Sequence, residues 1–537
     1  MSISSTFSVI RKQQQFYYLI KKHGKTLMKI EFLGHAGICI SYKQTKIVMD
    51  GWFTKNGAFD ASWYQFPANH YYMENDWSDL NAVIVSHEHM DHLDPEFLSS
   101  LPEDIPIYIP EYPSLNLYDK IKFLTNREAK QLSLEKSHKI GDINCQIWTE
   151  ESPINQDSIW VFKTTEKSII NTVDSKVTTS QLKSMMDYIG GEPNLLLIQC
   201  SGANWFPFVY TQYDSVKKMK VSEQKKEAKL NYTWSVIESL QPEHLVINAG
   251  PPAFLDKEIF YANDNPIFPN PGISKKWMLN KGYKKPVYAT MPGDIIDLEL
   301  NNYSENNNIR ENFSWENTSD YLKEYAKKMQ FYINSVKNRI DEITNKDFHE
   351  KLQEHFEKMF CVSTYFNERI NMSILFDIHG PDGGKWIANF SQKPYFKTFE
   401  KDDSFAFKYS FHSKWLKRIL YEKLPWVDFF LSLRFACWRS PDLYDDHLLG
   451  LLKFNDDDAT HAVEVFEKHL SADETLIVTT ADGKKYEIQK FCPHAGASLD
   501  DGIVTDKQIE CLRHHYIFDL ETGKCMNAKC DLKTKKL

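Results

Sequence analysis

A cluster of histidine and carboxylate residues directly after an apolar run places the strongest constraint on the fold of this chain. The apolar run 82–85 predicts a buried strand, and the pattern H-x-H-x-D-H follows one residue later. Because only 18 His occur among 537 residues, three of them in so short a stretch indicate a metal site rather than scattered surface histidines. The candidate ligands are His87, His89, Asp91 and His92.

Length and composition limit the classes of protein that this chain can belong to. At 537 residues it is too long for one core, and roughly three or four domains are expected. The net charge of -9 argues against a nucleic-acid binder. No stretch approaches the ~20 consecutive apolar residues of a membrane span. The 9 Cys form no disulfide framework over residues 1–437, which fits the cytoplasm. Residues 1–28 lack a secretory signal and predict a short helical N-terminal extension.

Residues 29–300 predict an α/β domain built around the metal motif. Strand patterns alternate with helical ones, and residues 217–240 predict a charged helix. The hairpin 158–173 delivers Asp174 at a strand end. Two facing sheets, outer helices and ligands at one edge suit an αββα sandwich. The predicted strands are 29–33, 38–40, 46–50, 82–86, 105–109, 145–148, 158–162, 168–173, 195–200 and 244–248.

Residues 301–450 are expected to form a helical and α+β middle region. The Asn-rich segment 301–308 predicts a linker or an exposed loop. Charged helical spacing over 321–360 predicts a pair of bracing helices. The run 372–390, turned at its Gly-Pro-Asp-Gly-Gly segment, predicts a hairpin. This hairpin resembles a part of the sterol-carrier-protein fold.

Residues 451–537 carry a second metal-binding pattern, C-x-H followed by C-x-x-H. Two thiolates and two imidazoles can hold a [2Fe–2S] cluster, with one ligand pair on each iron. A structural zinc site is the alternative. Pro493, Gly496 and the segment 518–523 match the all-β Rieske domain, and His515 is expected to pack or hydrogen-bond near the cluster. The predicted cluster ligands are Cys492, His494, Cys511 and His514.

The two metal patterns together predict an oxidoreductase. A hydrolase needs no electrons, because a Lewis-acidic metal activates water unaided. A cluster that passes single electrons therefore predicts redox-active non-haem iron at the first site, O₂ activation and substrate hydroxylation. No G-x-G-x-x-G fingerprint stands between a strand and a helix, so NAD(P)H-derived electrons are expected from a separate reductase, ferredoxin or cytochrome b5-like protein. The alternatives are a zinc hydrolase with a redox-sensing or docking Rieske domain, and an electron carrier or scaffold.

The chain resembles the CMP-N-acetylneuraminate hydroxylase family, which joins a Rieske domain to a metallo-β-lactamase-like domain. The matching stretches are 82–93, 171–174, 230–242, 249–250 and 424–442. The resemblance implies hydroxylation of an N-acetyl group on a small metabolite such as a sugar nucleotide, with electrons relayed by a cytochrome b5 system. In the animal members the Rieske domain comes first, whereas here it is C-terminal.

The H-x-H-x-D-H motif also resembles the signature of the metallo-β-lactamase superfamily, but the histidines of its third and fifth motifs are missing. Glu151 or Asp157 is expected to replace the former, and no counterpart of the latter stands beside Asn248. His35 is expected to form a structural hydrogen bond rather than to bind metal.

The number of irons stays open at one or two. One iron held by His87, His89 and Asp174 is the first choice, because a 2-His-1-carboxylate set leaves positions for O₂ and substrate. A second set uses Asp91 and His92 with Asp174, and both sets are filled in a di-iron site bridged by Asp174. A homo-oligomer and the choice between electron transfer within or between chains also stay open.

Two segments are candidates for substrate binding. Residues 201–207 follow a buried strand and either line a pocket or cap the sheet. Lysines of the helix 217–229 either attract a phosphate or carboxylate or form a solvated face.

Overall fold

The computed structural model describes residues 27–537 except residues 203, 394, 455, 471–473, 495 and 514. Two predictions lie outside the described residues: the N-terminal helical extension, apart from its last two residues, and the cluster ligand His514. None of the helices in the described part of the chain combines the length and the apolar character needed to cross a bilayer.

Two sheets face each other across an apolar core. The strands of the first are β1 Met28–Gly34, β2 Gly37–Tyr42, β3 Thr45–Met49, β4 Ala82–Ile84, β5 Ile107–Pro110, β6 Ala129–Leu132, β14 Ile295–Asp297 and β15 Asn302–Ser304. Those of the second are β7 His138–Ile140, β8 Ile143–Thr149, β9 Ser158–Lys163, β10 Ser168–Asn171, β11 Leu195–Gln199, β12 His244–Asn248 and β13 Val287–Tyr288. Their orders are β15-β14-β1-β2-β3-β4-β5-β6 and β13-β12-β11-β10-β9-β8-β7. Ile30 and Ile40 of the first sheet share a core with Ile147 and Leu197 of the second.

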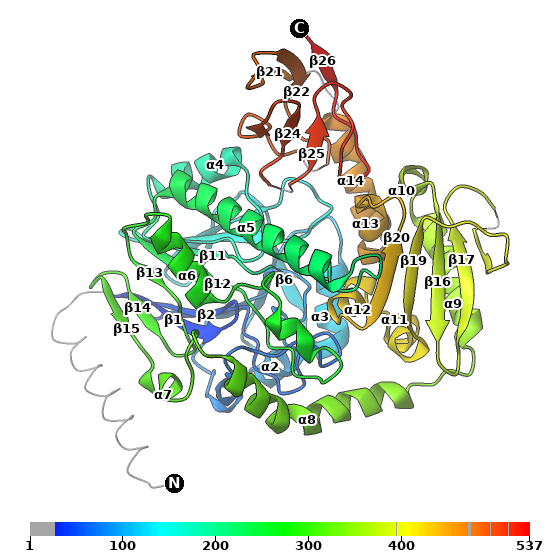
Figure 1. Cartoon of the computed structure of the whole chain (residues 1–537). Helices are drawn as coiled ribbons and strands as arrows, with labels where there is room; N and C mark the ends of the chain where they lie inside the picture. The colour runs from blue at the N-terminus through cyan, green and yellow to red at the C-terminus, as the bar shows by residue number, and fades with distance from the viewer. Residues whose placement is uncertain are drawn as a thin grey trace.

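Helices cover the outer faces of both sheets (Figure 1). Val83 of β4 packs outward on Leu98 and Ile121, whereas its neighbour Ile84 packs inward, so this short strand is buried on both faces. A strand buried on both faces needs an unbroken apolar run, which is the pattern of residues 82–85. The αββα sandwich is therefore confirmed. The helices are α2 Pro95–Ser100, α3 Asn116–Thr125, α4 Thr179–Ile189, α5 Ser215–Leu240 and α6 Pro271–Asn280, with the 3-10 turns η1 His70–Glu74 and η2 Phe260–Asp264.

The Asn-rich segment differs from the predicted linker or loop. It forms β15 and the short helix α7, Asn307–Arg310, and β15 extends the first sheet. Asp294 holds the segment in place, because it accepts a hydrogen bond from Asn306 N at 2.7 Å and forms an ion pair with Arg310. Asn favours turns locally, but this distant carboxylate supplies partners that composition does not reveal.

The middle region is α+β, as predicted. Its sheet has the order β18-β17-β16-β19-β20, and the predicted hairpin pairs Ser373 of β16 with Asn389 of β17. The predicted helix pair corresponds to α8 and α9, and the likeness to the sterol-carrier fold stays a prediction. The elements are α8 Ser319–Glu342, α9 Phe348–Val362, α10 Thr364–Ile370, β16 Ser373–His379, β17 Gly384–Asn389, β18 Phe396–Thr398, β19 Phe407–His412, η3 Ser413–Trp415, α11 Leu416–Glu422, α12 Trp426–Leu431 and β20 Phe435–Arg439.

The C-terminal strands form two small sheets at one end of the molecule (Figure 1). Two helices, α13 Asp446–Phe454 and α14 Asp457–Leu470, lead from the middle region to these strands. Tyr444, just before α13, pairs with Ala528 near the C-terminus, which ties the helix to the sheets. The strands are β21 Thr475–Thr479, β22 Lys485–Gln489, β23 Ile503–Val504, β24 Gln508–Glu510, β25 Ile517–Asp519 and β26 Thr534–Lys536.

Candidate metal centre and its cavity

The ligand segment 86–92 leaves the end of β4, where the edges of both sheets meet. Strands β3, β4 and β5 run parallel, so their ends lie side by side. Asp50, which follows β3, accepts hydrogen bonds from Ser86 N at 2.8 Å and from Ser86 Oγ at 2.6 Å. Ser158 of β9, in the other sheet, donates to Ser86 O at 2.8 Å. These bonds fix the start of the segment that carries the ligands.

A first metal position is formed by His87, His89 and Asp157. His87 Nε2 lies 2.9 Å from His89 Nδ1 and 3.9 Å from Asp157 Oδ1. All three offer ligand atoms within 4.8 Å of one another. Asp157 thus stands where the third-motif histidine is missing. Glu151, the other candidate for that place, instead accepts a hydrogen bond from Ser180 at 2.9 Å.

A second metal position is formed around His92. Its Nε2 lies 3.5 Å from Asp174 Oδ1 and 3.6 Å from Asp91 Oδ2. Asp174 groups with both His87 and His92 within 4.8 Å, so it lies between the two positions as a bridging ligand does. The structure therefore brings together all five residues predicted as metal ligands, with Asp157, one of the two candidates for the missing histidine. The number of metals that they bind stays a prediction.

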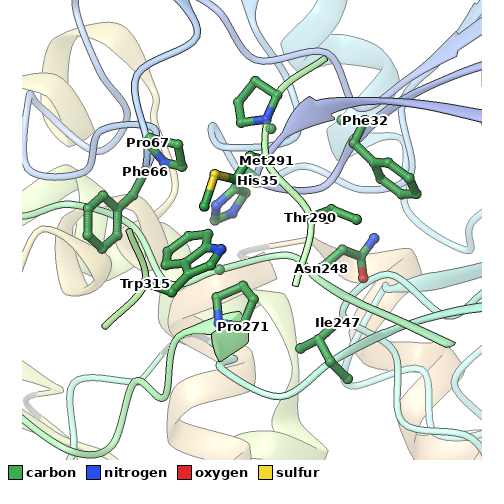
Figure 2. Close-up of a pocket in the computed structure, with 14 residues that line it drawn as sticks. Phe32, His35, Phe66, Pro67, Ile247, Asn248, Pro271, Thr290, Met291 and Trp315 are labelled. Carbon is green, nitrogen blue, oxygen red and sulfur yellow. The ribbon is translucent and has the colours of Figure 1, made fainter. Parts of the chain in front are cut away.

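His35 brings a further imidazole to the second position. It lies between β1 and β2, and its Nε2 is 2.9 Å from Asp91 Oδ2, which is the hydrogen bond we expected. The same three residues, His35, Asp91 and His92, also group within 4.8 Å. Ala249 N donates to His35 O at 3.0 Å, so His35 stands beside the segment that lacks the fifth-motif histidine. Figure 2 shows His35 and Asn248 on the wall of a separate cavity of about 20 Å³.

The electrostatics of the site favour a bound cation. Burial raises the pKa of Asp174 to about 6 and that of Asp157 to about 7. Burial also lowers the pKa of His89 to about 3. At His92 burial opposes the charged form, but Asp174 and Asp91 raise its pKa to about 10. Crowded carboxylates are costly when buried, and a divalent cation would stabilise them while binding the neutral imidazole of His89.

Unsatisfied polar atoms test whether this site fits a metal. Among the described residues, four buried atoms of the predicted metal ligands and Asp157 have no hydrogen-bond partner. They are His92 Nε2, Asp91 Oδ1, Asp157 Oδ1 and Asp174 Oδ1. Each such atom costs about 1–3 kcal/mol when left unpaired, so their convergence points to a ligand. Imidazole and carboxylate donors without thiolates suit non-haem iron, and zinc as well. The residues therefore fit one or two such ions.

Replacing Asp50 with alanine is expected to weaken metal binding without removing a ligand. Asp50 Oδ2 lies 3.0 Å from His92 Nδ1 and so holds the ring with Nε2 toward Asp174. Loss of such a supporting carboxylate typically lowers metal affinity about 10–100-fold. Titration of the metal-free protein with Fe(II) or Zn(II) measures this. Asp79→Ala, an exposed ion-pair partner of Lys46, is the control. Equal affinity of Asp50→Ala and wild type would contradict the role.

One large cavity adjoins both metal-binding patterns. It has a volume of about 610 Å³, and His89, Asp157 and Asp174 form part of its wall. His494 and Tyr516 of the C-terminal region form another part. The remaining lining includes the cationic residues Lys176, Lys225, Lys229, Arg439 and Lys453 and the aromatic residues Trp205, Phe206 and Phe430.

Three of the cationic lining residues come from α5 and β20. Lys229 donates to Gly202 O at 2.8 Å, and burial with nearby Lys225 lowers its pKa to about 7. Burial lowers the pKa of Lys225 to about 8. Arg439 donates Nε to Asp442 at 2.9 Å, while its buried Nη1 has no hydrogen-bond partner in the described chain. Gly202, Asn204, Trp205 and Phe206 line the cavity, which is the first of the two alternatives for their segment. Lys225 and Lys229 line it as well, and the anion that they are expected to attract stays a prediction.

The C-terminal cysteine–histidine pattern forms two buried loops. Cys492 N donates to Ala497 O at 2.8 Å, and Cys511 N donates to Tyr516 O at 2.9 Å, so both loops turn in the same way. Cys492, Cys511 and His494 are all buried. Two thiols and an imidazole on such loops fit a [2Fe–2S] cluster, with His514 as the remaining predicted ligand. His515 Nδ1 lies 2.9 Å from Glu510 Oε1, which is a hydrogen bond of the kind we predicted.

Comparison with known proteins identifies this region. Residues 453–537 match the family model of the Rieske [2Fe-2S] domain. The C-terminal part of the chain is a Rieske domain. Over 533 residues the chain is 26% identical to a Rieske 2Fe-2S iron–sulfur protein of Mycolicibacterium smegmatis, covering 95% of this chain and 100% of that one. A Rieske 2Fe-2S protein of Mycobacterium tuberculosis H37Rv is 26% identical over 530 residues, covering 94% and 98%.

Solved structures resemble the N-terminal half at low sequence identity. CmlA, a diiron β-hydroxylase from Streptomyces venezuelae, is 12% identical with a TM-score of 0.34, over 49% of this chain and 53% of that chain. The metallo-β-lactamase fold protein YhfI from Bacillus subtilis is 14% identical with a TM-score of 0.33, over 51% and 100%.

Sequence reasoning missed two carboxylates that support the ligands. Asp50 holds His92 and Ser86, and Asp446 lies 2.8 Å from His494 Nε2. Asp50 follows a predicted strand next to the metal strand, so the strand-end argument used for Asp174 also applies to it. Asp446 carries no comparable signal, because it begins a helix and its partner comes from a distant loop.

Proposed function

We propose that this protein is a Rieske-fed non-haem iron monooxygenase that hydroxylates a small metabolite, in the manner of CMP-N-acetylneuraminate hydroxylase. The observation that carries the proposal is the cavity of about 610 Å³, whose wall holds both His89 with Asp174 and His494. A substrate in this cavity would lie against both the candidate metal site and the Rieske domain, which supports the proposal. A zinc hydrolase with a sensing or docking Rieske domain remains the alternative that the test below separates.

The overall reaction is R–H + O₂ + 2 e⁻ + 2 H⁺ giving R–OH + H₂O. Iron bound at the histidine–carboxylate site would supply O₂ activation, and the cluster would deliver the electrons singly. The chain itself contributes the ligand atoms of His87, His89 and Asp157. Burial keeps the imidazoles of His87 and His89 neutral by lowering their pKa, which is the protonation state that metal ligation requires.

An anionic, partly aromatic substrate such as an amino-sugar nucleotide suits the cavity. Its volume falls within the ~300–1,000 Å³ range of small-molecule sites. Lys225, Lys229 and Arg439 offer positive charge to phosphate or carboxylate groups. Trp205 and Phe206 offer flat apolar surface for a base or a sugar face. His89 and Asp174 line the same cavity, so the end of the substrate beside them would be the one that is hydroxylated.

We propose a separate electron donor, namely a reductase, ferredoxin or cytochrome b5-like protein, that passes on electrons from NAD(P)H. The absence of a nicotinamide-binding fingerprint in the sequence supports this part of the proposal. The scattered cysteines support a cytoplasmic location. We propose that the protein does not bind nucleic acid, because its net charge of -9 would be repelled by the phosphate backbone.

Metal analysis of anaerobically purified protein tests the proposal. About three or four iron atoms per chain with Rieske absorption are expected, because the cluster holds two. NADH oxidation with a surrogate reductase should then depend on an N-acetylated sugar nucleotide and O₂, with hydroxylated product detected by mass spectrometry. Zinc at the histidine site, with hydrolysis in the absence of reductant, would instead favour the hydrolase. Reductant consumption that never depends on substrate would favour the electron carrier.

Phosphate binding to the cavity is expected to weaken as pH rises through about 7 to about 8. These are the lowered pKa values of Lys229 and Lys225, which are charged below them and neutral above. Calorimetry with inorganic pyrophosphate should show at least about tenfold weaker binding at pH 9 than at pH 6, equal to one pKa unit of free energy.

Lys225→Met should weaken pyrophosphate binding at pH 6 and flatten the pH dependence, because it removes one of the two titrating charges. Lys220→Met is the matched control, since Lys220 lies exposed on the same helix. This variant should change neither the affinity for pyrophosphate at pH 6 nor its dependence on pH. Affinity that does not vary with pH in wild type would contradict the role of these lysines.

A further inference from the structure

The Rieske loops contact the N-terminal sandwich of their own chain. Lys176 Nζ donates to Arg513 O at 3.0 Å, and the Arg513 guanidinium donates to Lys176 O at 2.5 Å. Arg513 also lies 3.6 Å from Glu150 Oε2, and both side chains are almost fully buried. Lys176 comes two residues after Asp174, and Arg513 directly precedes the predicted ligand His514. One reciprocal contact therefore joins the second Cys–His loop to the segment that follows the candidate ligand Asp174.

A second connection runs along α13. At its first residue, Asp446 lies 2.8 Å from His494 Nε2 and accepts hydrogen bonds from the Tyr516 hydroxyl at 2.8 and 3.0 Å. Since Asp446 occupies Nε2, Nδ1 is the ring nitrogen that would bind the cluster. At the other end of the helix, Lys453 lines the cavity beside His89. Alongside burial, its charge lowers the pKa of His89, as expected for a close cation.

The length of this connection is short. Asp446 and Lys453 are seven residues apart on one helix, which corresponds to roughly 10 Å along its axis. Both ends line the same cavity as Asp174 and His494. The cluster histidine and the metal-binding residues are thus held together by two sets of contacts within one chain, and neither set needs a second copy.

We infer that the electron passes from the cluster to the metal site within a single chain, and that Asp446 is the residue that positions His494 for this step. The inference rests on the proposed function and adds to it the intrachain path of the electron and the role of Asp446. One electron leaves the reduced cluster and one arrives at the metal site, so the step needs no other reactant. Asp446 acts through its contact with His494, a predicted cluster ligand, and is therefore a positioning residue.

Complementation between two inactive variants tests the route. His89→Ala disables the metal site and Cys492→Ser disables the cluster, and the two chains are co-expressed with different tags and purified through both. If transfer is intrachain, the doubly tagged protein turns over no faster than the sum of the two variants. A monomer, from which no doubly tagged species can be recovered, also supports the inference. Recovery of a substantial fraction of wild-type turnover would overturn the inference while leaving the proposed function standing.

Stopped-flow spectroscopy tests Asp446 without any substrate. Dithionite-reduced, iron-loaded protein is mixed with O₂, and reoxidation of the cluster is followed by its visible absorption. Asp446→Ala is expected to slow reoxidation at least tenfold with normal iron content. Asp446→Asn, which keeps the shape but loses the negative charge, should raise the reduction potential of the cluster, because a nearby anion stabilises the oxidised form. Unchanged rate and potential in both variants would overturn the role of Asp446.

Asp445→Asn is the matched control. Asp445 is a neighbouring carboxylate that caps α13 by accepting from Leu448 N at 2.8 Å, and asparagine caps helices equally well. It should leave both the rate and the potential unchanged. His89→Ala in the same experiment shows whether the metal site is the acceptor: if its cluster reoxidises as fast as that of wild type, the inference fails. If these tests support intrachain electron transfer but the wild-type protein hydroxylates no substrate, the proposed function fails and the inferred path of the electron stands.

Discussion

Replacing Cys492 with serine is expected to remove the [2Fe–2S] cluster and, with it, all reductant-dependent hydroxylation. Cys492 is fully buried in the first cluster loop, and a serine hydroxyl does not replace a thiolate as an iron ligand. Visible absorption and the electron paramagnetic resonance signal of the reduced cluster should fall to background. Iron at the histidine–carboxylate site should remain, because its ligands come from other strands.

The other cysteines of the same domain provide matched controls. Cys525 and Cys530 lie close to the cluster loops but outside the C-x-H and C-x-x-H patterns. Cys525→Ser and Cys530→Ser are therefore expected to keep the cluster spectrum. Loss of the spectrum in either variant, or its survival in Cys492→Ser, would contradict the assignment of the ligands.

Replacing His89 with alanine is expected to empty the first metal position and abolish hydroxylation. His89 provides one of three ligand atoms there and lines the cavity. Removing a direct ligand should weaken iron binding by more than the roughly 10–100-fold typical of a supporting residue. Iron analysis and Fe(II) titration measure this effect, and the Rieske spectrum should be unchanged.

Two acidic residues distinguish the candidate third ligands. Asp157→Asn should behave like His89→Ala, because Asp157 Oδ1 faces His87 Nε2 at 3.9 Å. Glu151→Gln should bind iron like wild type, because Glu151 is hydrogen-bonded to Ser180 instead. The reverse result, with iron lost only in Glu151→Gln, would contradict the geometry described for this position.

The sequence alone predicted the sandwich and both candidate ligand patterns, because each shows in residues close together in the chain. An apolar strand that ends in H-x-H-x-D-H, and two short cysteine–histidine loops, carry their chemistry in their spacing. The alternation of strands and helices likewise predicted the αββα architecture. Residues 453–537, which match the Rieske model, include the second of these patterns.

The tertiary structure alone decided how the ligands are completed and connected. Asp157 rather than Glu151 faces His87, and His35 reaches Asp91, because loops from different strands meet at one sheet edge. Asp446 meets His494 across a helix start and a distant loop. Such contacts depend on how whole domains pack, and no local pattern encodes them. The cavity between the two metal-binding regions, on which the proposed function rests, exists only because the chain folds them against each other.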